Sequence, residues 1–531
     1  KALARQRSER HASVAAFIKA LQSPIRPEEN PSHAVPSTPA PPPTNQSLPP
    51  TVLPGDQPSS QDPSLPTIIA TQAQVASKPM SLGEHNHTPR FHETGTVMQS
   101  APVPGSPNSR ASRVPSAPTK TAQKYIDEGN VFLDLKFYQE AIIAFDRALQ
   151  LDTALIAPIL GKAQALYHLQ QYTQSLEVNE QALQLDPTLA VAHNGKGNNL
   201  LNLNRYPEAL AAFEEAIQYN PGLATAYDGK GQALASLKRY PEALAAFEMA
   251  LRYNPNRATT HSSKGTIFNE LQRYPEAIAA YEQSLSLNPN NPVAQHNLGT
   301  ALYQMNRPHE ALLAYDRAIA LNPSNPISFN TKAWALLEIG RLNEALFNFD
   351  EALRRDSSLA TAYNGKGLTL LRSQRMSEAL QVLEIALKLD PKLASAHQSR
   401  GSALLNLKRY REALSAFERA LEIDPSLGIS YNGKGSIFNE LERYVEAIPA
   451  LEKAIQLMPY WAEPYHNKGH ALYSLKKNQE AVADFEQAVR LAPQWGLAYY
   501  NLSLALKRLK RSQEAQRALD ISRHLGYRPP R

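Results

Sequence analysis

The sequence of 531 residues contains no cysteine. This absence excludes disulfide bonds, thiolate metal sites and cysteine nucleophiles together. It fits a reducing compartment, where disulfides are rare, and we therefore expect a cytoplasmic protein. The chain also lacks any uninterrupted run of 18 apolar residues. A membrane-spanning helix needs about 20 such residues, so we expect no membrane partner.

A secretory leader is missing as well. The first residue is Lys1, and no charged segment leads into an apolar stretch followed by a cleavage site. We expect the sequence to be a piece of a longer polypeptide rather than a secreted precursor.

The chain also lacks a concentrated excess of one charge. The net charge is +6, but residues 1–120 carry 11 Lys and Arg against 7 Asp and Glu, which leaves only +2 for the other 411 residues. A nucleic-acid-binding domain usually gathers its basic side chains on one face. We therefore expect no nucleic-acid partner, and keep nucleic-acid binding only as a lesser alternative.

Proline is abundant in one region. Residues 24–118 contain 21 prolines, mixed with Ser, Thr, Gln and Asn. Such a composition favours polyproline II and supplies too little apolar surface to offset chain entropy. We predict a disordered Pro/Ser-rich linker over residues 23–120.

From Ala122 onward one pattern of residues recurs at a constant interval, and we number the positions of each repeat from 1 to 34. Position 8 is small, position 20 is Ala or Ser, position 24 is aromatic in most repeats, and position 32 is often Pro. Small residues let two helices approach closely, and Pro ends the second helix because it has no N–H. Twelve repeats follow one another without an insertion, from 122–155 through 496–529. The residues at position 8 are Gly129, Ala163, Gly197, Gly231, Gly265, Gly299, Ala333, Gly367, Gly401, Gly435, Gly469 and Ser503.

This period and spacing resemble the tetratricopeptide repeat (TPR), a helix–turn–helix unit of about 34 residues. The resemblance implies an all-α fold, a right-handed α-solenoid of twelve units over residues 121–531 with atypical end repeats. It also implies a scaffold that binds protein or peptide partners. We find no catalytic arrangement and expect no enzymatic activity, cofactor or metal in this chain.

The first 22 residues differ from the rest. Val14, Phe17, Ile18 and Leu21 form one stripe of an amphipathic helix. The segment resembles the C-terminal end of bacterial serine/threonine protein kinase domains, in which the Arg that matches Arg10 pairs with an activation-segment Glu. The catalytic motifs of that family are absent from this chain, and the alternative is an ordinary amphipathic helix.

In the TPR family, positions 2, 5, 9, 12 and 13 of the first helix line a concave groove. Here these positions are rich in amide side chains, which both donate and accept hydrogen bonds and so suit an extended peptide. Position 5 never carries the Lys of the clamp that binds chaperone C-terminal carboxylates. Our candidate groove residues are Asn130, Asn194, Asn198, Asn202, Asn269, Glu270, His296, Asn330, Trp334, Asn364, Asn432, Asn439, Glu440 and His466.

Three other patterns have competing explanations. Glycine recurs at position 6 (Gly161, Gly195, Gly229, Gly365 and Gly433), and we hypothesise that it leaves bare backbone beside a bound chain. Lysine recurs at position 7, where a structural role is preferred to a cationic stripe. His466 and His470 have the spacing of a helical metal pair, but a third ligand is not apparent.

A longer repetition is superimposed on this short period. Residues 266–271 recur almost unchanged as residues 436–441, five repeats later. This recurrence indicates that a five-repeat block was duplicated and that similar groove chemistry is presented twice.

These patterns lead to one main prediction and one alternative. We predict the C-terminal recruiting region of a bacterial serine/threonine kinase, with the kinase domain in cis. The alternative is a stand-alone TPR adaptor or assembly protein. The sequence leaves the oligomeric state undetermined.

Overall fold

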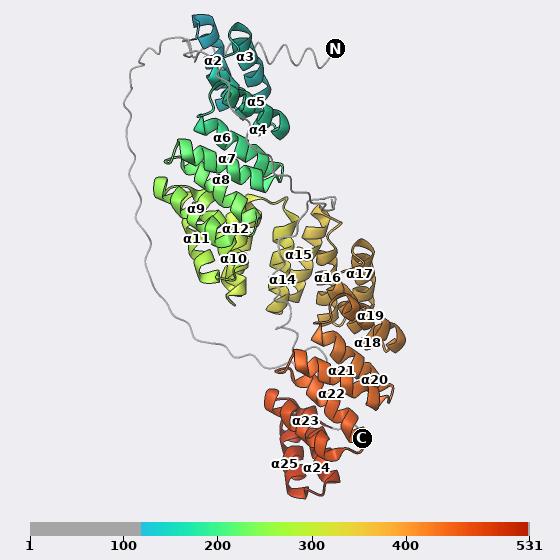
Figure 1. The fold of residues 1–531 in the computed structure, drawn as a ribbon. Helices are drawn as coiled ribbons and strands as arrows, with labels where there is room; N and C mark the ends of the chain where they lie inside the picture. The colour runs from blue at the N-terminus through green and yellow to red at the C-terminus, as the bar shows by residue number, and fades with distance from the viewer. Residues whose placement is uncertain (1–117, 529–531) are drawn as a thin grey trace, which may run out of the picture. The chain divides into compact units, whose positions relative to one another are not determined.

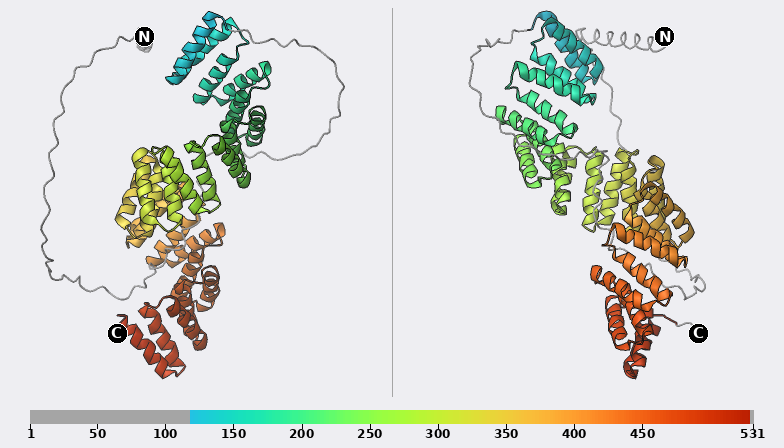
Figure 2. Two further views of the ribbon diagram at one scale, coloured as in Figure 1. Left: turned by 90° about the vertical axis from the view of Figure 1, so that its left-hand side faces the viewer. Right: turned by 45° about the vertical axis from the view of Figure 1, so that its right-hand side comes forward.

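The computed structural model describes residues 118–528, and within this range every regular element is an α-helix. The predictions for residues 1–22 and for most of the linker, residues 23–117, lie outside the described residues. The helices follow one another as twelve antiparallel pairs (Figure 1), which confirms the predicted all-helical array of helix–turn–helix units. Two further views show each pair beside the next in chain order (Figure 2).

The first helix of each repeat has an even number. These helices are α2 (Lys120–Asp134), α4 (Ile156–His168), α6 (Ala190–Asn202), α8 (Ala224–Ser236), α10 (Ala258–Glu270), α12 (Pro292–Gln304), α14 (Pro326–Glu338), α16 (Ala360–Arg372), α18 (Ala394–Asn406), α20 (Gly428–Glu440), α22 (Ala462–Ser474) and α24 (Gly496–Arg508). The second helices are α3 (Tyr138–Leu151), α5 (Tyr172–Leu185), α7 (Tyr206–Tyr219), α9 (Tyr240–Tyr253), α11 (Tyr274–Leu287), α13 (Pro308–Leu321), α15 (Leu342–Arg355), α17 (Met376–Leu389), α19 (Tyr410–Ile423), α21 (Tyr444–Leu457), α23 (Asn478–Leu491) and α25 (Ser512–His524).

The turn inside each repeat is short and uses one left-handed residue at position 15. Its φ is 60° at Asn204 and 59° at Lys238, and only repeat 7 places a glycine there, Gly340 with φ 78°. The next residue is usually Arg, which pairs with the Glu three positions later in the first turn of the second helix, as Arg239 does with Glu242 at 2.6 Å. The acidic side chain also suits the positive end of the helix dipole.

The turn between repeats is closed by side chains as well. An Asp or Asn at position 31 accepts a hydrogen bond from the backbone N–H two residues on, as Asp186 does from Thr188 at 2.9 Å. The ring at position 4 of the next repeat then bonds the carbonyl of the proline at position 32. His193 Nε2 lies 2.8 Å from the Pro187 oxygen, and the Tyr465 hydroxyl donates to the Pro459 oxygen at 3.1 Å. In these repeats the ring at position 4 therefore ties the first helix to the turn before it.

Where position 24 is aromatic, its side chain forms the centre of the repeat. Phe213 is fully buried, and a Cβ added at Gly197 would lie 2.7 Å from its ring. The same ring also contacts the next repeat, because a Cβ added at Gly229 would lie 2.3 Å from it. One ring thus packs against position 8 of its own repeat and position 6 of the following one.

This packing shows that the hypothesis of bare backbone at position 6 is wrong. Added Cβ atoms would meet Phe145 at Gly161, Phe349 at Gly365 and Phe417 at Gly433 within 2.4 Å, and Asn179 at Gly195 at 2.6 Å. Position 6 is therefore filled by a side chain of the preceding repeat, and its glycines permit close helix packing.

The lysines at position 7 join neighbouring repeats. Each pairs with the acidic residue at position 25 of the preceding repeat, which confirms the structural role and leaves no free cationic stripe. The pairs are Lys162–Asp146, Lys196–Glu180, Lys230–Glu214, Lys264–Glu248, Lys332–Asp316, Lys366–Asp350, Lys434–Glu418 and Lys468–Glu452, with N···O distances from 2.5 to 3.4 Å.

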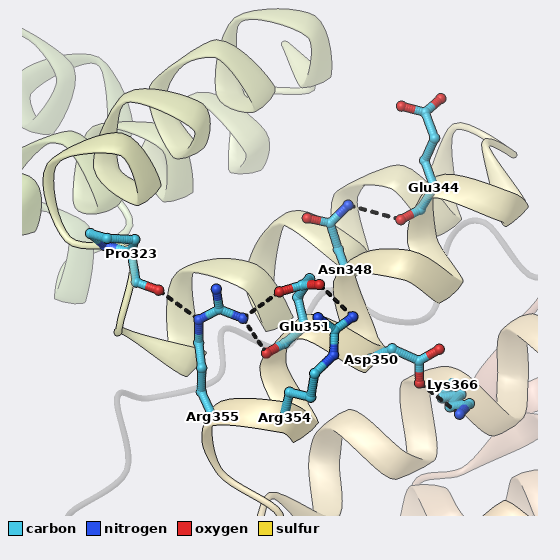
Figure 3. A network of polar contacts seen from close by, with 8 residues as sticks. All are labelled: Pro323, Glu344, Asn348, Asp350, Glu351, Arg354, Arg355 and Lys366. Carbon is cyan, nitrogen blue, oxygen red and sulfur yellow. Dashed lines mark hydrogen bonds and ion pairs between the residues drawn. The ribbon is translucent and has the colours of Figure 1, made fainter.

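Repeat 7 carries a network of such ties (Figure 3). Arg355 donates to the Pro323 carbonyl of repeat 6 at 2.6 Å and to the buried Glu351 carboxylate at 2.6 Å. The hydrogen bond from Arg355 holds the pKa of Glu351 below its ordinary value. On the other side Lys366 of repeat 8 donates to Asp350 at 2.6 Å.

The two end repeats are polar where the others are apolar or small. Position 3 is buried in the other eleven repeats, but in repeat 1 it is the exposed Lys124. Positions 21 and 28 of repeat 12 are the exposed Gln516 and Arg523, where the other repeats have Leu, Ile or Val. Polar outer faces are what a capping repeat requires. Among the described residues, no helix is long and apolar enough to cross a membrane.

Candidate functional site

The first helices form a continuous surface along the array. Each contacts the first helix of the next repeat, as α6 contacts α8 and α20 contacts α22, so positions 5, 9, 12 and 13 of neighbouring repeats lie next to one another. We call this the groove surface. The fourteen candidate residues lie on it from repeat 1 to repeat 11, so they form a long row rather than one compact site.

The candidates fall into two groups by exposure. Four are exposed and four are half-buried, so these eight are open to a ligand. The exposed residues are Asn130, Asn202, Glu270 and Glu440, and the half-buried ones are Asn194, Asn198, Asn269 and Trp334. The other six are buried: His296, Asn330, Asn364, Asn432, Asn439 and His466.

Several buried candidates hydrogen-bond to the next repeat. His296 Nδ1 lies 3.2 Å from the Ser328 hydroxyl, and Asn364 Nδ2 donates to the Ser395 hydroxyl at 3.1 Å. Asn467 Nδ2 donates to Asn432 at 3.0 Å. These bonds fix the register between successive first helices.

His466 lies against the Trp495 and Phe485 rings, with centroid distances of 4.5 and 5.6 Å. Burial lowers its pKa to about 4, so the imidazole is neutral near pH 7. Its Nε2 lies 2.8 Å from Asn501 Nδ2, so this ring nitrogen takes part in a hydrogen bond and is not free to bind a metal. No group of three or more His, Asp or Glu side chains in the described part of the chain is placed to hold a metal ion.

Comparison with protein families identifies the repeat. Tetratricopeptide repeat models match residues 126–190, 194–258, 292–325, 330–394, 394–427, 429–459 and 462–494, and a TPR repeat model matches 265–306. Together these matches cover well over half of the chain. The chain belongs to the tetratricopeptide repeat family.

Several solved structures resemble the chain at low identity. The Cut9–Hcn1 hetero-tetramer of the APC/C is 13% identical over 76% of this chain and 94% of that chain, with a TM-score of 0.46. YrrB, described as a TPR protein with an unusual peptide-binding site, is 27% identical over 38% of this chain and 99% of its own, with a TM-score of 0.32. Yeast Tom70 is 15% identical over 75% and 96%, with a TM-score of 0.35. No curated protein matches the sequence.

One carboxylate in this TPR array is buried at the groove surface. Asp228, at position 5 of repeat 4, accepts hydrogen bonds from Thr260 at 2.7 Å and Gln232 at 3.1 Å, and pairs with Arg257 at 3.0 Å. A buried charge is tolerable only when paired and hydrogen-bonded in this way. Asp228 therefore joins repeats 4 and 5 and is not free to bind a ligand.

Other side chains at the groove surface keep unused hydrogen-bonding capacity. The Oδ1 atoms of Asn194, Asn330 and Asn364, all at position 5, and Trp334 Nε1 are buried without a hydrogen-bond partner. Unpaired buried polar groups are rare because each costs free energy. The Oδ1 atoms of Asn269 and Asn439, at position 12 of repeats 5 and 10, are also without a partner, so such atoms occur along much of the groove surface.

Sequence reasoning missed a charged cluster in repeats 6 to 8. Burial and, after it, the Glu338 carboxylate raise the pKa of Tyr303, while burial lowers the pKa of the Arg372 guanidinium and Glu338 opposes this. Arg372 also donates to the Leu337 carbonyl at 2.8 Å. The sequence does contain a pattern that could have revealed this cluster: Glu338 at position 13 of repeat 7 is followed by Arg372 at position 13 of repeat 8.

Proposed function

We propose that this TPR array is a scaffold that binds an extended peptide or protein segment along its groove surface. The observation that carries the proposal is the continuous row of first helices with exposed and half-buried amides, of which Asn194, Asn198 and Asn202 share one face of α6. Side-chain amides can satisfy both the N–H and the C=O groups of an extended backbone. No catalytic role is assigned to any side chain of the row.

The charge arrangement favours a protein ligand over a nucleic acid. The lysines at position 7 are occupied by ion pairs between repeats, as Lys230 is by Glu214 at 2.8 Å. A nucleic-acid surface needs free basic side chains facing the phosphates. Binding of a single-stranded oligonucleotide with a steep salt dependence would favour the nucleic-acid alternative.

We further propose that the array recruits partners for a bacterial serine/threonine kinase joined in cis through the Pro-rich segment, in a reducing cytoplasm. The support is the resemblance of residues 1–22 to the end of a kinase domain. The alternative is a stand-alone adaptor. The reading frame upstream of Lys1 separates the two: kinase catalytic motifs support the first, and their absence supports the second.

Peptide binding can be tested without knowing the natural ligand. The full chain is used to select from a random peptide library displayed on phage, and the selected peptides are synthesised and titrated. We expect Asn198→Ala with Asn202→Ala to weaken binding about tenfold, because two peptide-backbone hydrogen bonds are lost. The control Gln218→Ala, on the exposed side of α7, is expected to leave affinity unchanged. Failure to select any binding peptide would contradict the proposal.

A further inference from the structure

Two exposed carboxylates occupy equivalent places five repeats apart. Glu270 is the last residue of α10, and Glu440 is the last residue of α20. Each follows the same three residues, Ile-Phe-Asn, and each is exposed at position 13 of the groove surface. Both segments belong to the repeated stretches 266–271 and 436–441.

Several features of the surroundings recur beside both carboxylates. A tyrosine from the preceding repeat stands beside each: the Tyr410 hydroxyl donates to Glu440 at 3.2 Å, and burial followed by the Glu270 charge raises the pKa of Tyr240. Next to each carboxylate in the chain, an asparagine (Asn269 or Asn439) has a buried Oδ1 without a partner.

The ring before each asparagine is covered in the same way. The Arg273 guanidinium lies 4.7 Å from the centroid of Phe268, and the Arg443 guanidinium lies 4.8 Å from that of Phe438. Each arginine also pairs with a glutamate three residues on, at 2.9 Å for Arg273 and 2.6 Å for Arg443. Both arginines are therefore occupied and do not neutralise Glu270 or Glu440.

A glutamate at the last residue of α10 or α20 does not stabilise the helix. The C-terminal end of a helix carries partial negative charge, so a carboxylate there is unfavourable and a cation is favourable. Among the described residues, neither Glu270 nor Glu440 takes part in an ion pair within 4 Å. His470 interacts with Glu440, but burial lowers its pKa and keeps the imidazole neutral near pH 7. Within the described residues, each of the two carboxylates therefore has no positively charged partner.

Repeat 7 has a basic side chain near the corresponding carboxylate. Glu338 has the same position, at the end of α14, and its charge acts on Arg372, at position 13 of the next repeat, and on Tyr303. Arg372 donates to the Leu337 carbonyl next to Glu338 at 2.8 Å, and among the described residues the two charged groups form no ion pair within 4 Å. Repeats 6 and 11 have Gln304 and Ser474 where repeat 8 has Arg372, so Glu270 and Glu440 lack even this nearby cation.

We propose that Glu270 and Glu440 are two corresponding binding sites for a lysine or arginine side chain of the peptide ligand, which supplies the positive charge that Arg372 provides near Glu338. The partner is a polypeptide with basic side chains in extended segments, and one array binds two such segments. A carboxylate beside a tyrosine ring suits a cation by both ion pairing and cation–π attraction. This inference rests on the proposed peptide-binding function.

The test uses peptides selected by the full chain from a random library, titrated by calorimetry. The expected peptides contain a Lys or Arg and bind with two molecules per array. Glu270→Gln or Glu440→Gln alone should leave one site, and the double variant should lose about tenfold or more at both. The matched control Glu282→Gln with Glu486→Gln removes two exposed charges from position 25, where the following repeats have Leu298 and Leu502 in place of the pairing lysine, and should change nothing.

A second measurement ties the effect to the ligand cation. Replacing the basic residue of the peptide by Gln should weaken binding to the wild-type array as much as E270Q/E440Q does, and should have no further effect on that variant. Peptides that bind the groove without a basic residue, or that ignore E270Q/E440Q, would overturn the inference while leaving the proposed function intact. Selection of no peptide would overturn both.

Discussion

Replacing Gly229 by alanine tests the packing between repeats. The new Cβ would lie 2.3 Å from ring carbons of Phe213, whereas carbon atoms in contact prefer about 3.5–4.0 Å. The ring has no free space to enter because it is fully buried and also lies in close contact with Gly197. Overpacking of this kind costs about 1–3 kcal/mol, and alanine in a helix returns about 1 kcal/mol relative to glycine. We expect a net loss of about 1 kcal/mol.

Native-state hydrogen exchange of α7 and α8 measures this loss locally, which matters because repeat arrays do not unfold as a single unit. Phe213→Leu should partly rescue the variant, with a coupling of about 1 kcal/mol, because the smaller leucine side chain leaves room for the added methyl group. As a control, Ser263→Ala at the same position of repeat 5 should change protection by less than about 0.5 kcal/mol. A gain of about 1 kcal/mol in G229A, as for an open helical glycine, would refute the reasoning.

Three further predictions concern stability. Asp228→Ala should lower the free energy of unfolding of repeats 4 and 5 by about 3 kcal/mol, because Arg257 and Thr260 lose their shared partner. Asp228→Asn should lower it by less, and equal losses in the two variants would contradict the role of the shared hydrogen bonds. Burial raises the pKa of Glu463 to about 8. The folded state therefore retains a proton that the unfolded state loses above about pH 4.5. The free energy of unfolding should fall as pH rises from about 4.5 to 8, by up to about 1.4 kcal/mol per pH unit. Burial lowers the pKa of His466 to about 4, so its contribution has the opposite sign, and stability should fall as pH drops from about 6.5 to 4. Unfolding midpoints measured across pH should therefore show the loss of stability from about pH 4.5 to 8 in the wild type but not in Glu463→Gln. The same slope in both proteins would exclude Glu463 as the source of that loss. Asn291 caps α12 by accepting from Val293 and Ala294 at 3.0 and 3.1 Å, so Asn291→Ala should cost about 1 kcal/mol in exchange protection of that helix, and no change would contradict the cap.

Most of the fold could be predicted from the sequence because every repeat restates it. Small residues at position 8 and Pro at position 32 recur in phase, and each predicts a contact or an end within one repeat. Position 6 was misjudged because the partner of Gly229 is Phe213, which belongs to the preceding repeat, and the period alone does not say which neighbour a residue faces. Ion pairs that join one repeat to the next, such as Lys230–Glu214, were hidden for the same reason.

The groove was predictable as a set of positions but not residue by residue. His296 and Asn364 occupy position 5 like Asn194, yet they are buried by the neighbouring repeat, whereas Asn194 remains half-buried. Burial at one position depends on the sizes of side chains in two repeats, so no single-repeat pattern determines it. The groove assignment itself stays a prediction until a ligand is bound.

Site-specific photo-crosslinking tests that assignment most directly. A benzoylphenylalanine placed at Asn202 or Trp334, on the groove surface, and at Leu313 or Phe347, exposed on the second helices, is illuminated with a library-selected peptide. We expect crosslinks from residues 202 and 334 and none from residues 313 and 347. Crosslinks only from residues 313 and 347 would show that the ligand binds the second helices, which would contradict the claim that the first helices form the binding surface.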